Sequence, residues 1–144
     1  RFIKLLTENS LHWKVPFNWF GSLETKELDG KKIIDIKMQG TAIVVDAARI
    51  YSLAHGIAAV NTRERLAAVG RALNVSEAES MGWIASFEYL QTLRLAAQID
   101  GHAIGGNPNA VDVEQLNSVD KTILRESLSK VRNLQQQLEL DYVR

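Results

Sequence analysis

The sequence predicts an all-α protein, an antiparallel bundle of four to five helices with a small N-terminal β-hairpin. Over most of the chain, apolar residues recur at intervals of three and four, which is the spacing of one helix face. Alternation of apolar and polar residues, typical of a half-buried strand, is confined to residues 20–38. With 144 residues, 46% of them hydrophobic, the chain is long enough to bury its own core, so we expect a single domain over residues 1–144.

The first expected helix covers residues 1 to about 13 and ends before Pro16 and Gly21, which interrupt the helical pattern. The pattern is already under way at Arg1. We therefore expect this chain to be excised from the C-terminal part of a longer protein.

The hairpin follows the first helix. Asp29 and Gly30 suit the positive φ angles of a tight turn, and Ile34, Ile36 and Met38 alternate with polar residues. This alternation predicts a strand that continues to Met38.

Start and stop signals delimit the remaining helices. Gly56 ends the first of them. Asn61 and Ser76, each followed three residues later by glutamate, are N-cap signals for the next two. The expected helices cover residues 41–55, 61–73, 76–103 and 118–144.

Charge and composition exclude several classes of function. The 17 basic and 17 acidic residues balance, so no basic field favours nucleic acid as a partner. Cysteine is absent, which excludes disulfides and thiolate chemistry and suits a reducing compartment, so we expect a cytoplasmic protein. The apolar runs are shorter than the roughly 18 residues that span a bilayer, so we expect no membrane partner.

Metal and catalytic motifs are also missing. The three histidines lack a metal-ligand spacing, and "GGNPN" is a turn pattern rather than a phosphate loop. Gly21-Ser22 followed by Asp35 resembles the start of the metal motif of polymerase-β-type nucleotidyltransferases, but Lys37 replaces its second acid and opposes a two-metal site. We therefore expect no catalytic residue, bound metal, cofactor or enzymatic activity in this chain alone.

Several polar residues instead accompany the apolar helices. Asp46 and Arg49 are neighbours on one helix face, where they form either a structural ion pair or part of a binding pocket. Lys37 lies just before a helix start, whose free N–H groups can receive an anion. Two further groups lie on the next helices: Asn61, Thr62 and Arg65, and Gln91, Arg94 and Gln98. Together these residues could bind a phosphate.

Four segments together resemble the family of C-terminal substrate-binding domains of nucleotidyltransferases, over nearly the whole chain. They are "DIKMQGTAIVVDAARIYSLAHGI", "NTRERL", "SFEYLQTLRLAAQ" and "LNSVDKTILRESLSKVRNLQ". The family's pattern is matched here by Asp35, Lys37, Gly40, Asp46, Arg49, Asn61, Thr62, Arg65, Arg94 and Gln98.

The resemblance implies a helical bundle similar to the substrate-binding half of kanamycin nucleotidyltransferase. Such a bundle would complete the cleft of a catalytic domain related to the uridylyltransferases of nitrogen signalling. It also implies a bacterial signal-transduction protein with CBS-pair and cyclic-nucleotide-binding domains upstream, and a parent that uses a nucleoside triphosphate and Mg²⁺. The implied substrate-binding residues are Lys37, Asp46, Arg49, Asn61, Thr62, Arg65, Arg94 and Gln98.

A second hypothesis is an interaction module that docks on its neighbours or forms a homodimer and binds no small molecule. An exposed apolar patch at Trp13, Phe17, Trp19 and Phe20 would favour it.

Overall fold

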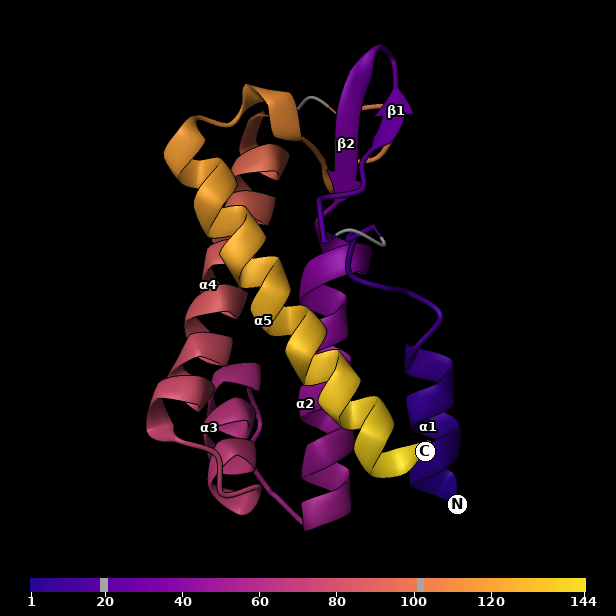
Figure 1. Cartoon of the computed structure of the whole chain (residues 1–144), viewed down its shortest axis with the longest axis vertical. Helices are drawn as coiled ribbons and strands as arrows, with labels where there is room; N and C mark the ends of the chain where they lie inside the picture. Colours follow the sequence, from indigo (N-terminus) through magenta and orange to yellow (C-terminus); the bar gives the residue numbers. More distant parts are fainter. Residues whose placement is uncertain (19–20, 101–102) are drawn as a thin grey trace.

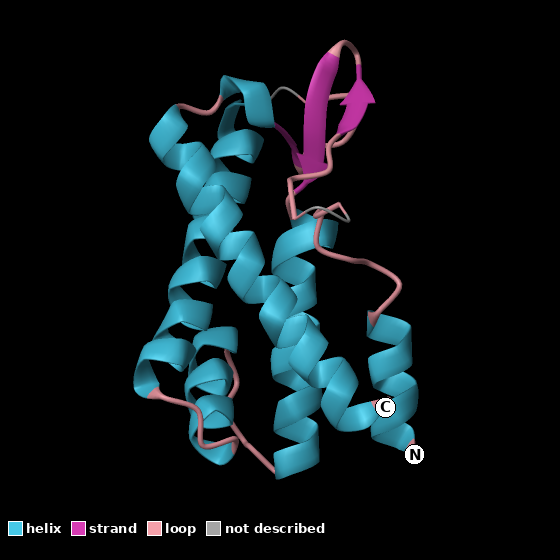
Figure 2. Cartoon of the chain, in the orientation of Figure 1, coloured by secondary structure: helices cyan, strands magenta, loops and turns pink. Residues whose placement is uncertain are grey.

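A computed structural model describes residues 1–18, 21–100 and 103–144. Its described part consists mainly of helices, with strands confined to one end, as Figure 2 shows, so the all-α prediction is confirmed. The α-helices are α1 (Phe2–Ser10), α2 (Ala42–His55), α3 (Thr62–Ala72), α4 (Glu77–Asp100) and α5 (Ser118–Tyr142). The strands are β1 (Lys26–Leu28), β2 (Lys31–Asp35) and β3 (Ala110–Asp112).

Helix α2 is the central element of the bundle. In Figure 1, α5 crosses in front of it, α1 lies on one side, and α3 and α4 lie on the other. The sheet lies beyond the end of α2 at which that helix begins. No helix in the described part is long and apolar enough to cross a membrane.

The core forms where the apolar faces of these helices meet. Tyr51 of α2 and Leu90 of α4 are fully buried. Helix α5 buries the apolar positions expected from its heptad-like spacing: Leu124, Leu128, Val131 and Leu138. This core fixes the relative positions of α2, α4 and α5, and hence of the polar residues that these helices carry.

The capping signals act as the sequence predicts. The Asn61 side chain accepts a hydrogen bond from the Glu64 N–H at 2.8 Å, and Ser76 Oγ accepts one from the Glu79 N–H at 3.1 Å. Gly56, with φ of 64°, ends α2. The expectation for α1 was too long by about three residues, because the helix ends at Ser10.

The hairpin turn is also confirmed, with positive φ angles at Asp29 (54°) and Gly30 (73°). The sheet contains a third strand that the sequence did not predict. Strand β3 pairs antiparallel with β2, with Ile34 opposite Val111, and the sheet order is β1-β2-β3.

The predicted extension of the second strand to Met38 is wrong, because β2 ends at Asp35. Asp35 Oδ1 accepts hydrogen bonds from the N–H groups of Lys37 (3.1 Å) and Met38 (2.9 Å), which turns the backbone away from the strand direction. One turn of π-helix, Lys37–Thr41, then leads into α2, and its Thr41 N–H donates to the carbonyl of Ile36, five residues back. We refer to Lys37–Thr41 as the π-turn.

Candidate functional site

A cavity of about 160 Å³ lies between the π-turn, α2 and α4. Its lining residues are Lys37, Thr41, Ala42, Val45, Asp46, Gln91 and Arg94. We refer to this space as the α2–α4 cavity. It brings together three of the predicted site residues: Lys37, Asp46 and Arg94. The first and the last of these are 57 positions apart in the sequence (94 − 37).

Lys37 reaches the cavity from the π-turn. Its backbone N–H is held by Asp35, so the turn that ends β2 also sets the position of the lysine. The side chain is half-buried, and it forms no ion pair within 4 Å among the residues that the structure describes. The lysine is therefore a cation without a charge partner within that distance.

Arg94 is held by Asn109, in the loop before β3. Its Nε donates to Asn109 Oδ1 at 3.0 Å, and Gln98 Nε2 donates to the same oxygen at 3.3 Å. A hydrogen bond through Nε leaves both terminal nitrogens of the guanidinium available to a ligand. The structure thus places the predicted residue Gln98 beside Arg94, where the two share one acceptor.

Asn109 is tied in turn to the π-turn. Its backbone carbonyl accepts from the Ile36 N–H at 2.9 Å, and its own N–H donates to Asn107 Oδ1 at 2.9 Å. Asn107 Nδ2 donates to Asp35 Oδ2 at 2.9 Å. We refer to Asp35, Asn107 and Asn109 as the asparagine bridge. It connects the backbone that carries Lys37 with the side chain of Arg94.

Asp46 lies on α2 and is half-buried. Burial raises the pKa of its carboxyl above the ordinary value of 3.8, and the charge of Arg49 acts in the opposite direction. No described residue donates a hydrogen bond to this carboxylate or forms an ion pair with it within 4 Å. A carboxylate that is half-buried yet unpaired is suited to accept a hydrogen bond from a ligand.

Arg49 occupies the neighbouring groove. It is exposed and, together with Asp46, lines a cavity of about 220 Å³ between α1 and α2. Asp46 therefore borders both cavities. The two side chains are close enough for the Arg49 charge to affect the Asp46 carboxyl, but they are not joined as an ion pair within 4 Å.

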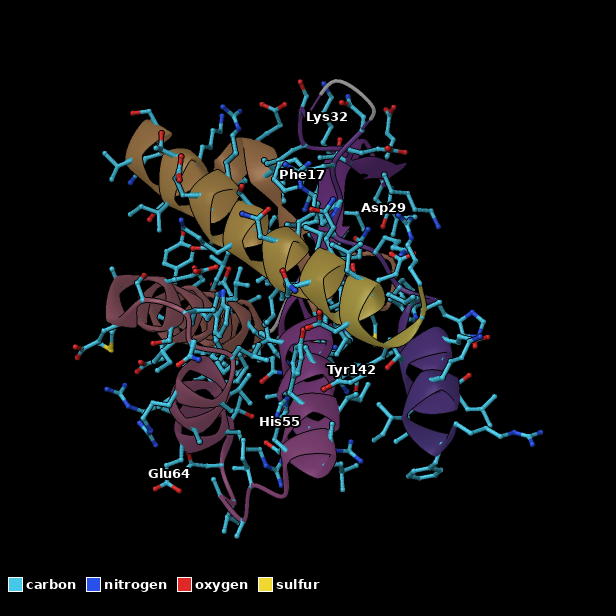
Figure 3. The ribbon with its side chains drawn as sticks, turned by 60° about the horizontal axis from the view of Figure 1, so that its bottom comes forward. Phe17, Asp29, Lys32, His55, Glu64 and Tyr142 are labelled. Atoms are coloured by element: carbon cyan, nitrogen blue, oxygen red, sulfur yellow. The ribbon has the colours of Figure 1, made fainter. Side chains whose placement is uncertain are left out.

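The start of α3, which carries the predicted site residues Asn61, Thr62 and Arg65, lies beside α4. Arg63 forms an ion pair with Glu88 of α4, one helical turn before Gln91. Figure 3 shows Glu64, in this first turn of α3, pointing away from the body of the domain.

Two residues at the start of α3 have structural partners. Asn61 caps the helix, and Arg65 Nε donates to the carbonyl of Ala59 at 3.0 Å. Thr62 is the first residue of the helix and is half-buried. None of the three residues lines the α2–α4 cavity.

The sequence did not identify Asn107 and Asn109, because the "GGNPN" segment was interpreted as a turn alone. The segment does contain turn geometry, with positive φ at Gly105 and Gly106. The signal that could have identified the bridge is two asparagines flanking a proline, since each amide side chain can both donate and accept hydrogen bonds.

No group of three or more metal-ligating side chains occurs within residues 1–18, 21–100 and 103–144. His12 and His55 are exposed, and His102 lies outside the described residues. The donor set of the α2–α4 cavity, two cations and one carboxylate, is suited to an anionic ligand rather than to a metal ion.

The fold and the cavity define a class of protein, a helical domain that presents a cationic pocket between its helices. A family model described as "Putative nucleotidyltransferase substrate binding domain" matches residues 1–142, and the chain belongs to this family. Neither the curated proteins nor the solved structures include a match to this chain.

Proposed function

We propose that this domain forms the substrate side of a nucleotidyltransferase cleft and that its α2–α4 cavity binds an anionic group of the substrate. The observation that carries the proposal is the convergence of Lys37 and Arg94 on one cavity, where neither forms an ion pair within 4 Å with a described acid. Two such cations favour phosphate or carboxylate, and a guanidinium with free terminal nitrogens can bind either in a bidentate manner.

The catalytic step belongs to another domain in this proposal. The parent protein would carry a uridylyltransferase-like catalytic domain and CBS-pair or cyclic-nucleotide-binding domains, and would act in bacterial signal transduction in the cytoplasm. Its nucleoside triphosphate and Mg²⁺ would bind to that catalytic domain. The family model and the absence of a carboxylate cluster in the described part support this division of roles.

Phosphate binding to the isolated chain tests the proposal. Titration of methyl phosphate, followed by NMR chemical shifts, should perturb residues around the α2–α4 cavity. Lys37→Ala and Arg94→Ala should each weaken binding about tenfold, because each removes one charge-assisted contact. Lys32→Ala is the matched control, since Lys32 lies on the hairpin and pairs with Glu114. Equal affinity in all four proteins would reject this site.

The interaction module is a second candidate, favoured by apolar side chains exposed beside the α1–α2 groove. Phe2, Leu5 and Leu53 are 65%, 58% and 59% exposed. Of the apolar patch expected from the sequence, Trp13 is 46% exposed, the Arg132 guanidinium lies over the Phe17 ring at 4.5 Å, and Trp19 and Phe20 lie outside the described residues. Light scattering distinguishes the candidates: a dimer disrupted by Leu5→Ser and Leu53→Ser would support the module.

A further inference from the structure

The α2–α4 cavity contains opposite charges that do not neutralise each other. Lys37 and Arg94 line it together with Asp46, yet no ion pair within 4 Å forms among the three. Opposite charges that border one small cavity attract each other, although a partly buried pair gains little unless its geometry is good. One cause of the separation of these charges is visible in the structure.

The asparagine bridge is that cause for Arg94. Its Nε is held at 3.0 Å by Asn109 Oδ1, and the main chain of Asn109 is fixed by Ile36 and Asn107. A guanidinium is planar, so anchoring Nε also restricts the direction of its terminal nitrogens. Arg94 is thereby prevented from folding onto Asp46, and its position is set before a ligand arrives.

The carboxylate of Asp46 is an acceptor without a donor among the described residues. Asp46 is half-buried and receives no hydrogen bond from any residue that the structure describes. A bare anion would satisfy Lys37 and Arg94 but would be repelled by Asp46. A cationic ligand would satisfy Asp46 but would be repelled by the other two. A ligand that matches all three groups carries an anion and a neutral hydrogen-bond donor close together.

The size of the cavity suits a small group. Its volume is about 160 Å³, and it is open to the surface. It therefore has room for a phosphate group and the hydroxylated carbon atoms next to it, while the rest of a larger ligand would extend into solvent.

We propose that the α2–α4 cavity binds a hydroxylated phosphate ester, such as a sugar phosphate, with its phosphate on Lys37 and Arg94 and a hydroxyl group donating to Asp46. This assignment rests on the proposed function, for which it names the substrate class. Asn109 acts as a positioning residue, because it holds Arg94 away from Asp46 and does not itself line the cavity.

The test compares three probes on the same chain by calorimetry: ribose 5-phosphate, methyl phosphate and ribose. We expect ribose 5-phosphate to bind about tenfold more tightly than methyl phosphate, which corresponds to one additional charge-assisted hydrogen bond. Ribose alone should bind most weakly. The preference for ribose 5-phosphate over methyl phosphate is the quantity that reports on Asp46.

Asp46→Ala should abolish this preference and make methyl phosphate bind more tightly, because a repulsive charge is removed. Asp46→Asn keeps the size of the side chain and should reduce the preference in the same direction, so it serves if the alanine variant does not fold. Circular dichroism of each variant verifies folding.

The outcomes separate this inference from the proposed function. If methyl phosphate binds in a manner that depends on Lys37 and Arg94 but the preference is absent or survives Asp46→Ala, the hydroxyl assignment is wrong and the anion site stands. If neither phosphate probe binds, both proposals are wrong.

Discussion

At the scale of single residues, the sequence spacing of Asp46 and Arg49 predicts their helix face but not the surface that each side chain lines. Their separation of three positions places them on one side of α2, as the sequence predicts. Spacing alone could not show that Arg49 extends into the α1–α2 groove and is exposed, while Asp46 borders both that groove and the α2–α4 cavity. Two neighbours on one helix face can therefore belong to different surfaces.

Asp46→Asn should stabilise the domain at neutral pH. A carboxyl whose pKa is raised in the folded state binds protons more tightly there than in the unfolded chain, so its charge opposes folding once the pH exceeds the folded pKa. The gain should be at most about 1 kcal/mol, because a half-exposed charge is screened by water. Urea denaturation measures it.

The gain from Asp46→Asn should shrink as the pH is lowered toward 3.8, since the wild-type carboxyl is then increasingly protonated in the folded protein. A loss of stability at pH 7 would instead identify Asp46 as half of an architectural ion pair.

Arg49→Ala should leave the fold intact and change the free energy of unfolding by less than about 1 kcal/mol, because an exposed charge without a close partner contributes little. Thermal unfolding of the variant beside the wild type measures this. A loss of about 3 kcal/mol would show that Asp46 depends on Arg49 for its burial.

At the scale of elements, helices α3 and α4 approach closely at Gly70. A Cβ atom on Gly70 would lie 2.6 Å from Ser80 Cβ, so a side chain there would force the two helices apart. Gly82, also within a helix, is different, since its Cβ would meet Lys130 Cε at 3.8 Å. The two glycines form a matched pair in which only the first is required by packing.

Gly70→Ala should therefore destabilise the domain by about 1 to 3 kcal/mol, the usual cost of overpacking. Gly82→Ala should have no such cost and should gain up to about 1 kcal/mol from the higher helix propensity of alanine. Chemical denaturation of both variants compares them directly. Equal effects would show that α3 can shift on α4 without penalty.

Asn109→Ala should weaken methyl phosphate binding several-fold, although Asn109 does not line the cavity, because Arg94 and Gln98 would lose their shared acceptor. Calorimetry measures the affinity and thermal unfolding gives the stability. A variant that unfolds earlier but binds methyl phosphate unchanged would show that Asn109 only supports the loop.

The sequence predicts an element well when the contacts that form it join residues close together in the chain, and poorly when they join distant residues. The helix caps at Asn61 and Ser76 depend on residues three positions apart, so their pattern is visible in the sequence. Strand β3 has three residues, too few to show alternation, and it exists because β2 offers a free edge. The end of β2 at Asp35 likewise depends partly on Asn107, 72 positions away.

At the scale of the whole molecule, the chain belongs to a family of nucleotidyltransferase substrate-binding domains, and its helices place polar side chains from distant parts of the sequence around one cavity. Within the described residues, no group of three or more metal-ligating side chains occurs. The candidate site could be predicted only in part from the sequence. Lys37, Asp46 and Arg94 converge, whereas Asn109, which accepts a hydrogen bond from Arg94, comes from a loop with no recognisable motif.

The isolated chain should show no nucleotidyl transfer. Incubation with labelled nucleoside triphosphates and Mg²⁺ should give no labelled product above the level of a buffer control. Turnover by the purified chain that is lost in Asp35→Ala would contradict this expectation and would place a metal site at the end of β2.

The π-turn determines the angular phase between Lys37 and α2. Each residue of an α-helix advances about 100°, so two positions nine residues apart would face opposite sides, about 180° from each other. A π-turn, whose N–H groups bond five residues back, contains one residue more than an α-helical turn. The nine positions therefore advance only as far as eight would in an α-helix, and the angle between the two side chains falls to about 80°. Lys37 and Asp46 can then line one cavity. Deleting one residue within Met38–Thr41 would consequently convert the π-turn into an ordinary α-helical turn, and Lys37, then eight residues before Asp46, would keep its phase of about 80° to that residue.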